Sequence, residues 1–97
     1  MPSLVFSPAA QRDLSTSWDY TEKTWGIEQA TAYTRNIQRT CNGLITGDTI
    51  SRDAGAIRAG YRKAAVGRHV IFLKLEASGD IEIVRILHSQ MDFDRHI

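Results

Sequence analysis

Two histidines and nearby arginines in the second half of the chain are the side chains best suited to acid–base chemistry. His69 and His88 could exchange a proton near neutral pH, and Arg68 and Arg85 could stabilise a crowded phosphate. Such a set is typical of metal-free RNA cleavage, in which a base deprotonates a 2′-hydroxyl. Strand alternation opposes this hypothesis, because Arg85 and His88 are three residues apart and point to opposite faces unless a bulge intervenes. The simpler interpretation of His88 is a strand-end residue bonded to the backbone.

Other catalytic chemistries lack a motif. The three histidines, His69, His88 and His96, have no acid or thiol at the spacing that zinc sites use. The glycines of the second half are too dispersed for a phosphate-binding loop, and no nucleophile elbow supports a serine triad. We therefore predict no catalytic residue, no metal and no cofactor.

The basic residues are unevenly distributed along the chain. Between Arg52 and Lys74 lie six basic residues and one acidic residue, a net charge of +5, which leaves a net charge of −4 for the rest. Segregated charge favours an acidic partner, either a nucleic acid or the acidic face of another protein. A solvated strand surface with scattered arginines is the alternative.

The chain length and composition indicate one globular domain, residues 1–97. With 97 residues, 42% hydrophobic and 24% charged, the chain suits one modest core and an open site. No apolar run approaches the roughly 20 residues of a membrane helix, and residues 1–6 lack a basic leader, so we expect a cytoplasmic protein that does not contact membranes. The single Cys41 cannot form an intramolecular disulfide, and we interpret it as a small core residue.

The first half of the sequence predicts a short strand followed by two helices. Residues 4–6 form the strand, Ser7 and Pro8 begin a helix over residues 8–25, and Gly26 ends it. A second helix begins at Ile27, and Asn42–Gly43 supplies its stop. One residue between two helices predicts an antiparallel hairpin. Its expected core residues are Leu14, Trp18, Trp25, Tyr33, Ile37 and Leu44, with Ile27, Ala30 and Cys41 on the same face of the second helix.

The second half changes to a period of two and predicts strands over residues 58–66, 69–76 and 81–88, after a loop over residues 46–55. The fold class is thus α+β: an N-terminal strand, a helical hairpin, a three-stranded antiparallel meander and a short C-terminal tail. In the last strand we expect Ile81, Ile83, Arg85 and Leu87 on one face and Glu82, Val84, Ile86 and His88 on the other, with the hairpin against Val84 and Ile86. Both faces carry apolar residues, and the hairpin can cover only one.

This order of elements, with Trp25–Gly26 followed by Gln29–Ala30 and Tyr33, resembles the toxins of the RelE/ParE superfamily. Three segments of the second half narrow the likeness to the ParE branch. They are residues 57–63 (Ile-Arg-Ala-Gly-Tyr-Arg-Lys), residues 66–72 (Val-Gly-Arg-His-Val-Ile-Phe) and residues 84–88 (Val-Arg-Ile-Leu-His) with Met91–Asp92 after them.

The resemblance implies the toxin of a type II toxin–antitoxin module, of the kind associated with plasmid stabilisation. Such a toxin acts on DNA gyrase, blocks replication and is neutralised by a ParD-type antitoxin. It would contact operator DNA only indirectly, through the antitoxin. A ribosome-dependent mRNA endoribonuclease of the RelE type is the alternative, and an inactive, purely antitoxin-binding relative is a third. His69 stands where some ribonuclease relatives carry an arginine, and residues 89–93 contain no tyrosine base.

We predict that the partner, antitoxin or gyrase, contacts the basic strands and the adjoining tail. We also expect a disordered acidic antitoxin segment to cover the sheet face that the hairpin leaves open. The predicted contact residues are Arg58, Tyr61, Arg62, Arg68, His69, Arg85, His88 and Met91.

Overall fold

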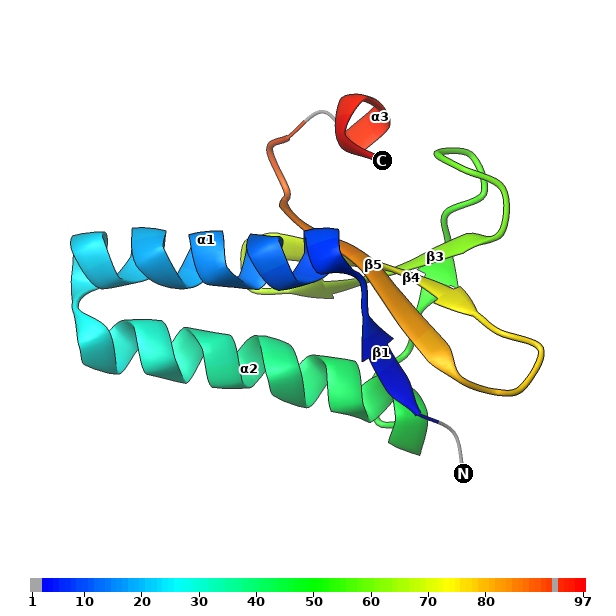
Figure 1. The fold of residues 1–97 in the computed structure, drawn as a ribbon, viewed down its shortest axis with the longest axis horizontal. Helices are drawn as coiled ribbons and strands as arrows, with labels where there is room; N and C mark the ends of the chain where they lie inside the picture. The colour runs from blue at the N-terminus through cyan, green and yellow to red at the C-terminus, as the bar shows by residue number, and fades with distance from the viewer. Residues whose placement is uncertain (1–2, 92) are drawn as a thin grey trace.

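The computed structural model describes residues 3–91 and 93–97, which form a helical hairpin against a five-stranded mixed sheet (Figure 1). The sheet order is β1-β5-β4-β3-β2, with β1 parallel to β5 and the other pairs antiparallel. The predicted α+β class is confirmed, and the central meander gains an edge strand on each side. Among the described residues no helix is long and apolar enough to cross a membrane. The elements are β1 (Leu4–Phe6), α1 (Pro8–Trp25), α2 (Ile27–Thr46), β2 (Arg52–Asp53), β3 (Tyr61–Val66), β4 (His69–Leu75), β5 (Ile81–His88) and α3 (Phe93–His96).

Ser7 fixes the start of α1 and ties it to the sheet. Its Oγ accepts a hydrogen bond from the Ala10 amide at 3.0 Å, as expected of an N-cap, and donates to the Val84 carbonyl at 2.7 Å. Gly26, at φ +94°, then allows the chain to reverse between α1 and α2. The predicted bounds of α1 and the predicted start of α2 are confirmed.

The predicted stop of α2 at Asn42–Gly43 is wrong, because the helix continues to Thr46 and ends at Gly47, where φ is +90°. Gly43 does not reverse the chain, but its small size allows close packing. A Cβ at this position would lie 2.1 Å from Thr49 Oγ1, whose hydroxyl donates to the Thr40 carbonyl at 2.9 Å. The absence of a side chain at Gly43 therefore lets the following loop fold back onto the helix.

The start of β3 also differs from the prediction. Residues 58–60 form a turn, in which the Tyr61 amide donates to the Arg58 carbonyl, and the strand begins only at Tyr61. Gly60 adopts φ +84°, which a strand cannot contain. The loop expected over residues 46–55 contains the short strand β2, which pairs with Arg62 and Lys63.

A bulge in β5 changes the predicted facing of its side chains. Leu73 lies opposite Ile83 but Phe72 lies opposite Arg85, so Val84 is the extra residue. Ile81, Ile83 and Ile86 consequently share the face toward the hairpin, whereas Val84 and Leu87 pack on the other face. The expectation that the hairpin packs on Ile86 is confirmed. The expectation that Val84 shares the face of Ile86 is wrong, and so is the expectation that Leu87 shares the face of Ile81 and Ile83.

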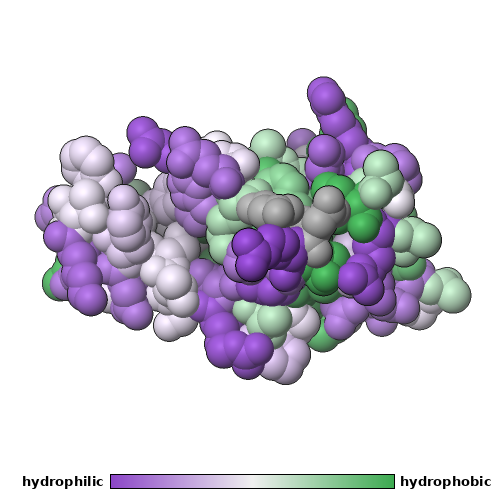
Figure 2. Space-filling model, turned by 90° about the horizontal axis from the view of Figure 1, so that it is seen from above, coloured by the Kyte–Doolittle hydropathy of each residue, from purple (hydrophilic) through white to green (hydrophobic). Residues whose placement is uncertain are grey.

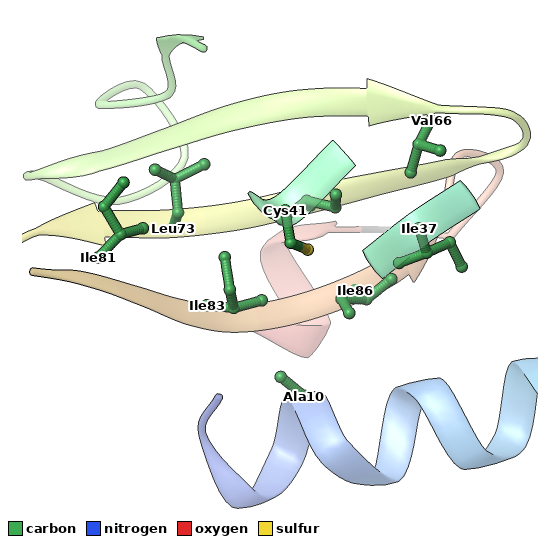
Figure 3. Packing of buried hydrophobic residues seen from close by; sticks show 9 residues of the cluster. Ala10, Ile37, Cys41, Val66, Leu73, Ile81, Ile83 and Ile86 are labelled. Atoms are coloured by element: carbon green, nitrogen blue, oxygen red, sulfur yellow. The ribbon is translucent and has the colours of Figure 1, made fainter. Parts of the chain in front are cut away.

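The main core lies between the hairpin and the sheet, and Figure 3 shows side chains from α1, α2 and the central strands converging there. Ile37 and Cys41 are fully buried, as predicted, and Leu14, Trp18, Tyr33 and Leu44 are half-buried. Trp25 and Ile27 are exposed instead of buried. The buried side chains of α1 are small ones, which allows α1 to lie close to the elements beside it. They are Ala10, Ser17 and Thr21.

The chain itself covers the other face of the sheet. Fully buried Phe72 packs edge-to-face on Phe93 of α3, with ring centroids 4.9 Å apart, and Tyr61 and Leu87 complete this second cluster. Viewed from above, apolar residues gather toward the end of the molecule that holds the sheet and α3, and paler or hydrophilic residues cover the hairpin end (Figure 2). The chain itself thus covers part of the face that was expected to be open, and the expectation that an antitoxin segment covers the rest stays a prediction.

Candidate functional site

A groove of about 770 Å³ runs between α1 and the end of the sheet. One wall comes from α1, where Tyr20 and Trp25 are 69% and 68% exposed. The opposite wall comes from the last residues of β5, including Leu87, and from Met91 of the tail. Exposed aromatic side chains beside a concave surface are typical of a surface that receives a partner.

Tyr33, at one end of this groove, holds the β3–β4 turn in place. Its hydroxyl lies 2.6 Å from His69 Nδ1 and accepts a hydrogen bond from the Arg68 amide at 3.1 Å. Gly67, at φ +54°, makes this approach possible, because a Cβ there would lie 2.7 Å from the Tyr33 ring. The turn residues Arg68 and His69 are thus positioned by a side chain from α2.

His88 lies directly opposite His69 in the β4–β5 ladder, with the two ring centroids 5.5 Å apart. Its Nδ1 accepts a hydrogen bond from the Gln90 amide at 3.2 Å, which confirms the interpretation of a strand-end residue bonded to backbone. Burial lowers the pKa of His69, the neighbouring His88 lowers it further, and Asp13 partly opposes both effects. The lowered pKa favours a neutral His69 ring at neutral pH.

Arg85 lies near the groove, but its guanidinium is already bound. Its Nε and Nη2 donate to the two carboxylate oxygens of Asp13 at 2.8 and 2.9 Å, and Nη1 donates to the His96 carbonyl. The hydrogen bond to Asp13 raises the pKa of Arg85. Arg85 is therefore part of the contact between α1 and β5, not a free cation beside the histidines.

The predicted contact residues fall into two groups. The groove brings together Arg68, His69, His88 and Met91. Arg58, Tyr61, Arg62 and Arg85 do not line the groove, and their side chains make contacts within the fold instead. Arg58 donates to the Ile97 carbonyl, Arg62 donates to Ser51, and Tyr61 is buried under the ammonium group of Lys74.

Sequence reasoning missed the aromatic wall of the groove and its link to α2. Trp25 and Tyr33 have helical spacing from core residues, and so they were predicted to belong to the packing of the hairpin. Tyr20 carried no signal in the sequence.

The groove offers hydrogen-bond donors and apolar side chains to a bound partner. The groove brings together three members of the hypothetical RNA-cleaving set, Arg68, His69 and His88, whereas Arg85 is bound to Asp13 and His69 Nδ1 lies against the Tyr33 hydroxyl. No group of three or more His, Cys, Asp or Glu side chains in residues 3–91 and 93–97 could hold a metal ion.

Comparisons with known proteins agree on one family. Residues 4–93 match the family described as the ParE toxin of the type II toxin–antitoxin system parDE. The chain is 40% identical over 93 residues to Toxin ParE1 of Mycobacterium tuberculosis (strain CDC 1551 / Oshkosh), covering 96% of this chain and 95% of the relative. It is 36% identical over 91 residues to Toxin ParE1 of Caulobacter vibrioides, covering 94% and 93%. A solved structure described as the chromosomal ParDE TA system from P. aeruginosa shares the fold, with a TM-score of 0.78 at 20% identity over 93% of this chain and 98% of that one.

Proposed function

The chain belongs to the ParE toxin family of type II toxin–antitoxin systems, and from this premise we propose that it is a non-enzymatic toxin. In this proposal it acts in the cytoplasm as one domain, binds DNA gyrase, traps it on broken DNA and so blocks replication. A ParD-type antitoxin neutralises it by binding, and only the antitoxin contacts operator DNA.

The observation that carries the proposal is the groove between α1 and β5. Tyr20 and Trp25 are two-thirds exposed there, at 69% and 68%, beside apolar residues that a protein segment could cover. Two polar groups nearby already have partners within the fold: His69 Nδ1 lies against the Tyr33 hydroxyl, and Arg85 is bound to Asp13. A binding role accounts for both features.

A gyrase cleavage assay tests the target. Supercoiled plasmid, purified gyrase and ATP are incubated with the purified chain, and the reaction is stopped with detergent and protease. We expect linear plasmid that increases with the dose of the chain and disappears when the cognate antitoxin is added first. No linear product at any dose, with inhibition of growth retained in cells, would exclude gyrase as the target.

Ribosome-dependent mRNA cleavage is the second candidate, because Tyr33, His69 and His88 bring three groups capable of proton transfer into one groove. Primer extension on mRNA bound to purified ribosomes tests it. Cleavage by the wild-type chain that is lost in a folded His88→Ala variant would replace the gyrase proposal. Intact mRNA at toxin concentrations that linearise plasmid would support the gyrase proposal.

A further inference from the structure

We infer that the end of the groove at His69 and His88 is a carboxylate-binding site, in which the two imidazole Nε2–H groups and Arg68 receive an acidic side chain of the antitoxin. The inference rests on the proposed neutralisation by a bound antitoxin. It adds the chemistry of the contact, namely a pair of imidazole N–H donors beside one cation.

The hydrogen bonds of Tyr33 favour one tautomer of His69. The hydroxyl has one hydrogen to donate, and it accepts from the Arg68 amide. Its two possible acceptors among the described residues are the Val66 carbonyl, which it contacts at the long distance of 3.5 Å, and His69 Nδ1. At 2.6 Å, His69 Nδ1 is the better acceptor for that hydrogen. A neutral ring that accepts at Nδ1 carries its hydrogen on Nε2.

His88 reaches the same state through the backbone. The Gln90 amide can only donate, so His88 Nδ1 accepts and the hydrogen of the neutral ring lies on Nε2. Within residues 3–91 and 93–97, neither Nε2 atom has a hydrogen-bond partner. The two groove-lining histidines, on neighbouring strands, therefore each have a donor without an acceptor among the described residues.

This state of the rings selects an anion over a metal ion. A metal needs the lone pair of Nε2, whereas both Nε2 atoms here carry hydrogen and would have to lose it. An oxyanion instead accepts from N–H donors, and such hydrogen bonds are stronger when the acceptor is charged. The site therefore suits an acceptor with a negative charge.

The charges around the two rings are nearly balanced, which favours a single carboxylate. Arg68 of the turn is exposed and adds a positive charge, and Asp13 of α1 is neutralised by Arg85 of β5. Tyr33 of α2 and Tyr20 of α1 are the other titratable groups that line the groove in the described part of the chain. A nucleic-acid strand would require several cations along the groove, whereas Arg68 is the one basic residue with a permanent charge that lines it in the described part of the chain.

The apolar part of the groove indicates that the carboxylate belongs to a peptide. Tyr20, Trp25 and Met91 can cover aliphatic side chains of an amphipathic segment, while an aspartate or glutamate on the same segment reaches His69 and His88. The occupant that we propose is thus an antitoxin segment that combines apolar anchors with one acidic residue.

Nitrogen NMR of the isolated chain tests the site without any partner. Long-range ¹H–¹⁵N spectra should show both rings as the Nε2–H tautomer. Titration with the α-amide of N-acetylglutamate, whose one carboxylate is that of the side chain, should shift the Nε2 signals of His69 and His88 but not those of His96, which lies outside the groove. The α-amide of N-acetylglutamine, which has no carboxylate, should shift none. Signals of the Nδ1–H tautomer in either ring, an absence of shifts with the glutamate amide, or shifts with inorganic phosphate alone would each overturn the inference.

Binding of the cognate antitoxin provides the second test. His88→Leu should weaken it about tenfold or more by faster dissociation, whereas His88→Gln, which retains an N–H donor, should lose less. His96→Gln is the matched control and should bind as the wild type does. Equal losses for the Leu and Gln variants would contradict the inference, while neutralised growth arrest in the wild type would leave the proposed function intact.

Discussion

Asp13 on α1 and Arg85 on β5, separated by 72 residues in sequence, form a two-point ion pair that joins the hairpin to the sheet. The same Asp13 Oδ2 accepts a hydrogen bond from the Ile86 amide at 2.9 Å. Since β1 pairs only with the first residues of β5, the rest of that strand has a free edge. Asp13 therefore satisfies a backbone group that no neighbouring strand could reach.

Replacing Asp13 should destabilise the fold more than replacing another acid of the same helix. Asp13→Ala leaves Nε and Nη2 of the half-buried Arg85 and the Ile86 amide without an acceptor, which should cost about 2 kcal/mol in the free energy of unfolding. Asp19→Ala, on the exposed side of α1, should cost less than about 0.5 kcal/mol. Urea unfolding followed by circular dichroism compares them, and equal losses would show that the ion pair does not stabilise the fold.

The loop after α2 should depend on the small size of Gly43. Gly43→Ala places a Cβ against Thr49 and should destabilise the protein by about 1–3 kcal/mol, although alanine favours a helix more than glycine does. Thermal unfolding measures the loss. If the clash between the new Cβ and Thr49 is responsible, Thr49→Ala should reduce the stability less in the Gly43→Ala variant than in the wild type. Purely additive losses of stability would exclude the clash as the cause.

The sequence predicted the elements better than their facing. Ser7–Pro8 and Gly26 define local backbone states, so the bounds of α1 follow from the chain alone. The bulge at Val84 depends on pairing with Phe72 and Leu73, which lie on another strand, and no local pattern indicates it. The candidate site was predicted least accurately. Trp25 has the spacing of a core residue, and only the position of the helices relative to the sheet shows that it is exposed.

Acidification should destabilise the protein partly through His69. The fold lowers the pKa of this ring, mainly through burial and then through His88, so the unfolded chain binds the proton first as the pH falls. The contribution is fully present above the ordinary value of about 6.5 and is lost as the pH drops through the lowered value in the fold. Unfolding free energies measured from pH 8 to pH 5 should show this loss, and His69→Gln should flatten the profile. An identical slope in the variant would assign the effect to other groups.

Cys41 should react with thiol reagents only when the protein unfolds. It is fully buried in the main core, and burial raises its pKa to about 12, so little thiolate forms at neutral pH. Mass spectrometry after brief iodoacetamide treatment should show unmodified native protein and complete modification in denaturant. Rapid modification of the native protein would mean that α2 opens from the sheet far more readily than its packing implies.

Two aromatic residues should separate binding from stability. Trp25 is 68% exposed beside the groove, so Trp25→Ala should change the free energy of unfolding by less than about 0.5 kcal/mol. Phe72 is fully buried in the second cluster, and Phe72→Ala should cost about 3–5 kcal/mol, a large part of the stability of a domain of this size.

Antitoxin binding, measured by biolayer interferometry on folded protein, should weaken about tenfold or more in Trp25→Ala because an exposed aromatic anchor is lost. Lys23→Ala, an exposed change on the same turn of α1, is the control and should bind normally. Wild-type affinity in Trp25→Ala would place the antitoxin elsewhere on the surface, and an unfolding loss as large as that of Phe72→Ala would show that the indole is part of the core after all.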